Sequence, residues 1–199
     1  MGGPGFGLSP SVQFVISLAP NSRPWHHTAR WRHFKHRESP MNRNESSDTQ
    51  GDPVEIRRGG KADLEGIVEV FRASRSERMR HLALRSPKSD REYFGRLFDE
   101  HSVMVAEEGG IVGFCVFGAG WIEHLYVMPG FQGRGIGSML LERLKELNSE
   151  LQLWTFQRNV EGRRFYESKG FKVVEETDGI NNEEGEPDVR YVWRKPGSG

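Results

Sequence analysis

Hydrophobic residues recur at helix and strand spacings from residue 53 onward, and they predict four helices and seven strands. Apolar positions three or four residues apart, such as Leu64, Ile67, Val68 and Phe71, indicate a helix with one buried face. Short runs rich in β-branched and aromatic residues, bounded by Gly or Pro, indicate strands. The predicted helices are 62–75, 90–101, 136–147 and 160–169, and the predicted strands are 54–57, 102–107, 111–117, 121–127, 151–156, 171–176 and 189–194.

The order of these elements predicts a single α/β domain. The strands at 102–107 and 111–117 are joined by Glu108-Gly109-Gly110, which is a hairpin signal, whereas strands and helices alternate in the second half. A hairpin-connected front and a strand–helix–strand back imply a mixed sheet with helices on both faces. A chain of 199 residues has room for one such domain with a substantial core.

Residues 1–52 differ in composition from the rest of the chain. They begin with Gly, Pro and Ser, continue with a basic, tryptophan-bearing stretch at 23–37, and show neither a helix nor a strand period. We therefore predict a disordered N-terminal extension at 1–52, before a folded domain at 53–195, with Met41 as an alternative start of translation. The basic stretch has the composition of a nucleic-acid contact, but no predicted fold supports it, so we interpret it as a solvated tail.

Composition and charge argue against several classes of function. The 28 basic and 28 acidic residues balance, so net charge favours neither a nucleic acid nor a membrane surface as partner. No apolar run approaches the roughly 20 residues that a membrane-spanning helix needs. The single cysteine, Cys115, cannot form an internal disulfide, which indicates a reducing cytoplasm, and its apolar surroundings indicate an inert buried thiol.

A glycine-rich turn between a predicted strand and a predicted helix carries the clearest chemical signal. It contains Gly133, Gly135 and Gly137, with Arg134 between the first two. Backbone N–H groups at a helix start converge on one point, and the helix dipole adds partial positive charge there. The predicted occupant is a phosphate or pyrophosphate, which the glycines allow to approach closely and Arg134 can contact.

Two common phosphate-binding loops do not fit this turn. A Walker A loop requires Gly-Lys-Ser/Thr, and the turn has no lysine. A dinucleotide fingerprint requires G-x-G-x-x-G, and Ser138 or Leu140 falls where its last glycine should be.

The pattern that remains, Gln132-x-x-Gly135-x-Gly137 preceded by Tyr126-Val127-Met128-Pro129, resembles the cofactor motif of the GNAT superfamily of N-acetyltransferases. The segment 159–171 resembles that family's second motif, N-x-x-A-x-x-F-Y-x-x-x-G-F. The resemblance covers 53–195 and implies an N-acetyltransferase domain there. It also implies a mixed, mostly antiparallel sheet of about seven strands, flanked by about four helices and splayed at the cofactor site.

The resemblance implies an enzyme that transfers an acetyl group from acetyl-coenzyme A, its acetyl-donor cosubstrate, to a primary amine of a small molecule or peptide. It implies no metal, no nucleic acid and no membrane partner, and it leaves a homodimer open. A non-catalytic acyl-CoA-binding regulatory module on the same fold is the alternative. The residues implied to bind the cofactor are Leu125, Tyr126, Val127, Gln132, Gly133, Arg134, Gly135, Ile136, Gly137, Ser138, Asn159 and Tyr166.

Acetyl transfer needs a base, because alkyl amines are mostly protonated at neutral pH. The resemblance implies a base on the strand before the glycine turn, at Glu123, acting directly or through an ordered water. Strand alternation predicts that Glu123 shares a face with Trp121, Leu125 and Val127, and that His124, the rival base, shares the other with Ile122 and Tyr126.

The second motif contributes two further roles by resemblance. Tyr166 matches the family tyrosine that hydrogen-bonds the coenzyme sulfur and acts as general acid, and Asn159 matches a residue that contacts the pantetheine arm or an ordered water. The family's oxyanion donor is a backbone N–H near Val127.

Two charged segments make opposite predictions about the acceptor. Seven acidic residues fall within 175–188, and such a rim would concentrate a cationic acceptor, although a solvated loop has the same composition. By resemblance, the helical segment 75–99 shapes the acceptor side, and its Arg and His residues at 75–85 would admit an acidic or phosphorylated acceptor. The sequence therefore leaves the acceptor's identity open.

Overall fold

The computed structural model describes residues 53–76, 86–180, 182 and 185–197. The predictions for 1–52, and most of the basic stretch at 75–85, lie outside the described residues. The described strands are β1 (Glu55–Arg58), β2 (Ser102–Glu107), β3 (Ile111–Gly118), β4 (Trp121–Val127), β5 (Glu150–Phe156), β6 (Lys172–Glu176) and β7 (Asp188–Arg194). The described helices are α1 (Leu64–Ser76), α2 (Pro87–Glu100), α3 (Ile136–Leu147) and α4 (Val160–Ser168), with single 3₁₀ turns at Lys61–Asp63 and Pro129–Phe131.

The seven strands form one mixed sheet in the order β1-β2-β3-β4-β5-β7-β6. Neighbouring strands run antiparallel except β4 and β5, which are parallel because α3 carries the chain from one to the other. The predicted class, a mostly antiparallel sheet with helices on both faces, is confirmed.

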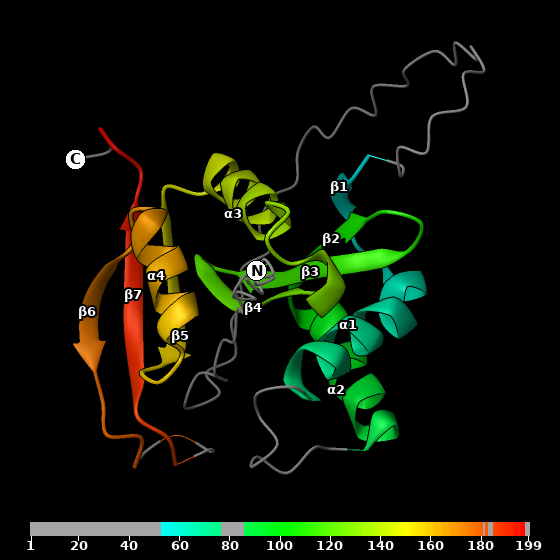
Figure 1. The fold of residues 1–199 in the computed structure, drawn as a ribbon, viewed down its shortest axis with the longest axis horizontal. Coiled ribbons are helices and arrows are strands. Elements are labelled where there is room, and N and C mark those ends of the chain that lie inside the picture. Colours follow the sequence, from blue (N-terminus) through cyan, green and yellow to red (C-terminus); the bar gives the residue numbers. More distant parts are fainter. Residues whose placement is uncertain (1–52, 77–85, 181, 183–184, 198–199) are drawn as a thin grey trace, which may run out of the picture.

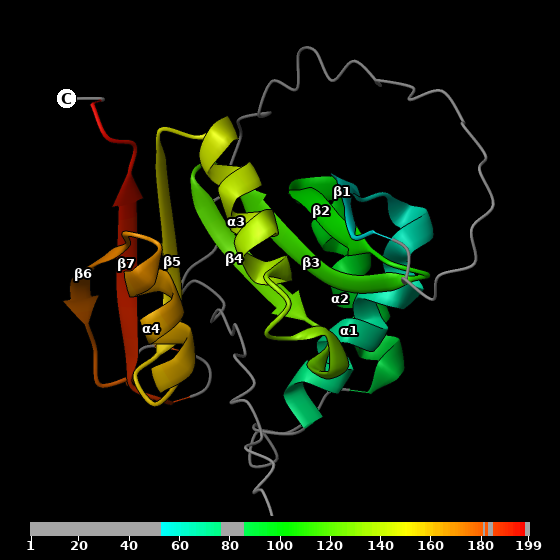
Figure 2. The same ribbon diagram turned by 45° about the horizontal axis from the view of Figure 1, so that its top comes forward.

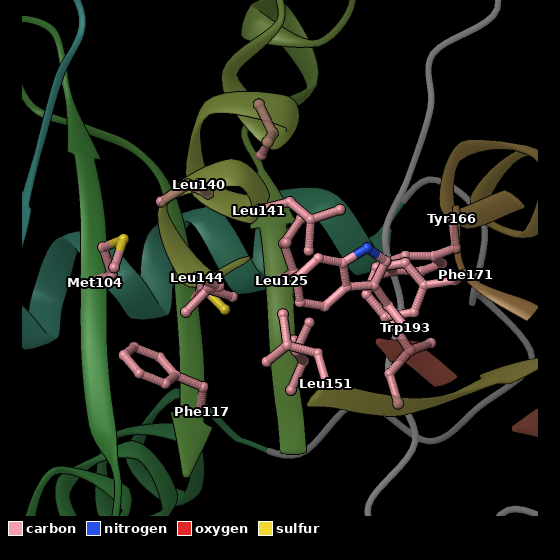
Figure 3. Packing of buried hydrophobic residues seen from close by; sticks show 14 of the residues in the cluster. Met104, Phe117, Leu125, Leu140, Leu141, Leu144, Leu151, Tyr166, Phe171 and Trp193 are labelled. Carbon is pink, nitrogen blue, oxygen red and sulfur yellow. The ribbon is translucent and has the colours of Figure 1, made fainter. Parts of the chain in front are cut away.

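Two separate apolar clusters bury the two faces of the sheet. On one face, α1 and α2 lie side by side against β2, β3 and β4, and their apolar residues pack around Phe94 and Phe114. On the other face, the leucines of α3 meet Leu125 and Leu151 (Figure 3), and Tyr166 of α4 lies beside Phe171 in the same cluster. The site at the end of β4 is thus supported from both sides by packed helices (Figures 1 and 2).

Helix α2 begins three residues before its predicted start at Asp90. Ser86 caps it by accepting a hydrogen bond from the backbone N–H of Ser89, and Pro87 takes the first helical position, where its missing N–H costs nothing. Asp90 lies instead in the first turn, where it is buried and paired with Arg72 of α1 at 2.5 Å. This ion pair links α2 to α1.

The predicted alternation of faces along β4 is wrong in its first half. Val116 of β3 pairs with His124, but the next residue, Phe117, pairs with Ile122, so Glu123 is an extra residue in a β-bulge. The bulge places Ile122 in the same apolar cluster as Leu125, whereas strict alternation would put them on opposite faces.

Strands β4 and β5 separate after one pair of residues. The only register pair between them is Trp121 with Gln152, at the beginning of both strands. Beyond that point the two strands diverge (Figure 2). The splay predicted at the cofactor site is therefore present, and it leaves one edge of β4 without a neighbouring strand.

Candidate functional site

The edge of β4 that faces the gap carries backbone groups without a ladder partner. Val127 is opposite Gly113, and Met128 donates its N–H to the carbonyl of Val112 at 2.8 Å. In an antiparallel ladder, this bond makes Val127–Gly113 a non-hydrogen-bonded pair, so the N–H and C=O of Val127 point away from β3. Leu125 lies two residues earlier and has the same orientation. Both residues thus direct their backbone groups to the side that β5 has left.

The carbonyl of Val127 is nevertheless satisfied by two side chains. The hydroxyl of Ser74, on α1, donates to it at 3.1 Å, and the amide Nε2 of Gln132 donates to it at 3.0 Å. The amide oxygen of Gln132 is buried and has no hydrogen-bond partner. A buried acceptor of this kind is available to a donor on a ligand.

The glycine-rich turn joins β4 to α3 in a conformation that glycine favours. Gly133 has φ +76° and Gly135 has φ +84°, and Gly135 is the residue immediately before the first helical residue, Ile136. A Cβ at either glycine would meet no protein atom within 4 Å. The two glycines therefore allow the left-handed backbone conformation and leave the space in front of the turn open.

A pocket of about 190 Å³ lies against this turn. It collects seven of the twelve residues predicted to bind the cofactor, together with Phe131 and Phe165, which were not predicted. Phe131 immediately precedes Gln132 of the first motif and Phe165 immediately precedes Tyr166 of the second, so motif position was the signal for both. The pocket is lined by Val127, Phe131, Gln132, Gly133, Gly135, Ile136, Gly137, Ser138 and Phe165.

The remaining predicted cofactor residues lie outside this pocket. The side chain of Leu125 is buried in the α3 cluster, although its backbone faces the gap. Tyr126 packs in the opposite cluster against Phe71, at a ring distance of 5.4 Å. Arg134 is paired with Glu108 of the β2–β3 turn at 2.7 Å, so an anion bound at the turn would share the guanidinium with that carboxylate.

Asn159 caps helix α4. Its side-chain oxygen accepts from the backbone N–H of Gly162 at 3.1 Å, and its amide nitrogen donates to Thr155 at 3.0 Å. A Cβ on Gly162 would lie 2.3 Å from that amide nitrogen, so a larger residue there would force the Asn159 side chain to shift. The described role of Asn159 is therefore capping, and its predicted contact with a pantetheine arm stays a prediction.

Glu123, at the bulge, is half-buried and has no hydrogen bond or ion pair among the described residues. Burial raises its pKa above the ordinary value of 4.5. A carboxylate held out of water without a cationic partner binds a proton more readily than usual. A raised pKa suits a general base, because a carboxylate whose pKa lies closer to neutral pH accepts a proton from an amine more readily.

His124 has the environment of a structural residue. Its Nε2 is 2.8 Å from the hydroxyl of Tyr93, and Phe71, Phe94 and Tyr126 surround its ring. Burial lowers its pKa to about 3, with smaller contributions from the positive charges of Arg75 and His101. The imidazole is neutral at physiological pH and enclosed, so nothing about it favours the role of rival base.

We expect the stability of the folded protein to fall as pH drops from about 6.5 towards 3. Over this range the unfolded chain protonates His124 but the folded protein does not, so His124 contributes a loss of about 1.4 kcal/mol per pH unit. Urea unfolding at pH 4 to 7 checks this against His124→Gln, which keeps a partner for Tyr93 but does not titrate. The substituted protein should show the shallower decline, and equal slopes would contradict the assignment.

Tyr166 and Cys115 are both fully buried in the apolar cluster on the α3 side of the sheet. Burial raises the pKa of each well above its ordinary value, so both groups keep their protons at neutral pH. A protonated phenol can act as a hydrogen-bond donor or general acid, whereas a protonated thiol is a poor nucleophile. For Cys115 this environment agrees with the inert thiol predicted from the sequence, whereas the general-acid role of Tyr166 stays a prediction.

Three of the seven acidic residues at 175–188 are paired with arginines. Asp188 is buried and accepts hydrogen bonds from Thr177 and Asn182, and Glu183 and Glu184 lie outside the described residues. Salt bridges join Glu175 to Arg190, Glu176 to Arg163 and Glu186 to Arg158. The described part of the segment is therefore a weaker attractant for cations than its composition suggests.

The described parts of the chain contain neither a cluster of metal ligands nor a membrane-spanning helix. No three His, Cys, Asp or Glu side chains there come together as a metal would require. No helix there is long and apolar enough to cross a bilayer. The expectations of a cytoplasmic protein and of a homodimer stay predictions.

Comparison with known proteins gives a consistent family. The family model described as an acetyltransferase (GNAT) domain matches residues 99–173. An uncharacterized N-acetyltransferase of Archaeoglobus fulgidus is 33% identical over 141 residues, a match that covers 61% of this chain and 95% of that protein.

Two further relatives are more distant. The peptidyl-lysine N-acetyltransferase YiaC of Escherichia coli is 30% identical over 70 residues, covering 35% of this chain and 48% of YiaC, so the chain matches only about half of that protein. The structure of YncA from Salmonella typhimurium, determined with its cofactor acetyl-CoA, has a TM-score of 0.57 at 20% identity and covers 74% of this chain and 98% of YncA. At that identity the likeness is one of fold.

Proposed function

Because this chain belongs to the GNAT superfamily of N-acetyltransferases, we propose that it transfers the acetyl group of acetyl-coenzyme A to a primary amine. One observation carries the proposal: the unpaired edge of β4 leads directly into a glycine-rich helix start that faces a pocket. Such an edge can bind an extended chain through its backbone, and such a helix start can bind a phosphate. Coenzyme A combines these two chemistries.

The residues at the turn fit a diphosphate. Backbone N–H groups at the start of α3 are unpaired within the helix, and the open space in front of Gly133 and Gly135 lets phosphate oxygens approach them. Gln132 and Ser138 line the same pocket with polar side chains. The pantetheine arm would then follow the β4 edge, where Leu125 presents its backbone groups and Val127 its N–H. Acetyl-coenzyme A, when bound, supplies an activated thioester carbonyl.

The chain's own groups supply the other requirements of acetyl transfer. Glu123 accepts a proton from the acceptor ammonium, directly or through water, because its burial raises its proton affinity. The N–H of Val127 donates to the carbonyl oxygen as negative charge develops there. Tyr166 keeps its proton at neutral pH and can donate it toward the departing thiolate.

The acceptor is an amine of a small molecule or a lysine side chain in a peptide. The name of YiaC, a peptidyl-lysine acetyltransferase, supports the second choice. The internal pairing of Glu175, Glu176 and Glu186 reduces the case for an acceptor chosen mainly by its positive charge.

Release of free coenzyme A thiol from acetyl-coenzyme A across a panel of amines and lysine peptides tests the proposal. We expect amine-dependent thiol release above the rate without amine, and acetylated product by mass spectrometry. Tight binding of coenzyme A with no amine-dependent release across the panel would instead favour the alternative, a non-catalytic acyl-CoA-binding regulatory module. Absence of coenzyme A binding would overturn both.

A further inference from the structure

Ser74 is the feature near the gap that neither sequence motif contains. It lies on α1, fifty-three residues before Val127, and its side chain is buried. Its hydroxyl donates to the Val127 carbonyl at 3.1 Å. The side-chain amide of Gln132, which comes after Val127 in the chain, donates to the same oxygen at 3.0 Å. One backbone acceptor therefore has two side-chain donors from elements that are distant in the chain.

We propose that Ser74 is a positioning residue for acetyl transfer: with Gln132 it takes the place of a neighbouring strand as the hydrogen-bond partner of the Val127 carbonyl. This inference rests on the proposed function. In a continuous sheet, a neighbouring strand would donate to that carbonyl and accept from the Val127 N–H. Here β5 has separated from β4 after Trp121–Gln152 and ends at Phe156, so neither group has a strand partner on that side.

The two orphaned groups have opposite consequences for catalysis. The N–H is useful, because it can donate to the thioester oxygen as negative charge develops. The carbonyl is harmful, because its partial negative charge opposes that oxyanion and offers the acceptor ammonium a competing partner. With Ser74 and Gln132 bound to the carbonyl, Val127 presents only its donor to the substrate. The bonds also hold the Val127–Met128 peptide in place, since the Met128 N–H is fixed by Val112.

A purely structural role for Ser74 makes a different prediction. Ser74 would then stabilise the packing of α1 on β4, and its loss would lower the unfolding temperature without changing turnover by the folded protein. The proposed role instead changes kcat, and leaves coenzyme A affinity unchanged because Ser74 does not line the pocket.

The test compares full-length protein with Ser74→Ala, Gln132→Ala and the double variant. Ser168→Ala is the matched control, because its hydroxyl also donates to a backbone carbonyl, that of Phe165 at 2.7 Å, but on an exposed surface. For each protein we would measure kcat and KM by thiol release, coenzyme A affinity by calorimetry, and the unfolding temperature.

We expect Ser74→Ala to lower kcat about fivefold, with coenzyme A affinity unchanged and Ser168→Ala indistinguishable from the natural protein. In the double variant, kcat should fall by a larger factor than the product of the two single-variant factors. Only the double variant leaves the buried Val127 carbonyl without either side-chain donor. An unchanged kcat for Ser74→Ala, or single losses that simply multiply, overturns the positioning role while leaving the proposed function intact. A natural protein without amine-dependent thiol release overturns the function and this inference together.

Discussion

Replacing Gly135 with alanine is expected to weaken coenzyme A binding about 30-fold, equivalent to about 2 kcal/mol. Gly135 has φ +84°, and a Cβ there would project into the open space where phosphate oxygens must approach the helix start. The left-handed backbone adds a folding cost of about 1–2 kcal/mol for any residue with a side chain. Calorimetric titration with coenzyme A and urea unfolding measure the two effects separately.

Gly170→Ala is the control for the folding cost alone. Gly170 has nearly the same backbone angle, φ +82°, and a Cβ there would make only an ordinary contact with Trp193 at 3.7 Å. Both variants should lose similar stability, but only the Gly135 variant should lose affinity. Equal affinities in the two variants would mean that the turn does not hold the ligand.

Replacing Glu123 with glutamine is expected to lower kcat by at least about 100-fold, the usual contribution of a general base. Coenzyme A affinity should change little, because Glu123 does not line the pocket at the turn. In the natural protein, the rate should rise with pH through the pKa of Glu123, which burial raises above 4.5. The variant should lose that limb of the profile, and a limb that persists unchanged would assign the base elsewhere.

The same substitution should stabilise the folded protein at neutral pH. The raised pKa means that, between 4.5 and that pKa, the folded state holds a proton that the unfolded state has released, so stability falls as pH rises through this window. Glutamine does not titrate and escapes this loss. Glu55→Gln, at an exposed strand position, is the control and should change neither the rate nor the stability appreciably.

Local sequence signals predicted the elements well because they depend on neighbouring residues. The strand Trp121–Val127 and the helix Ile136–Leu147 have the bounds that the apolar pattern predicted. The start of α2 was missed because Ser86 and Pro87 are capping signals outside the apolar period used to delimit the helix. The bulge at Glu123 was missed because it arises in the pairing with β3, which no pattern within β4 reveals.

The candidate site likewise contains some residues that the sequence could reveal and others that only the structure reveals. The glycines of the turn could be identified from the sequence, because a positive φ is a local requirement that glycine meets at least cost. Ser74 could not, because its importance comes from a hydrogen bond to a carbonyl fifty-three residues away. The pairing of Arg134 with Glu108, and of Glu175 with Arg190, likewise depends on strands and turns meeting in space.

The sequence by itself determined the family, the order of the elements and the glycine-rich form of the turn on which the proposal of phosphate binding rests, since each follows from residue type and short-range spacing. Only the tertiary structure decided where β4 separates from β5 and which side chains donate to the Val127 carbonyl. It also decided that His124 is enclosed whereas Glu123 is only half-buried. The physical reason is that solvent exclusion and hydrogen-bond satisfaction are properties of a packed environment, to which residues far apart in the chain contribute together.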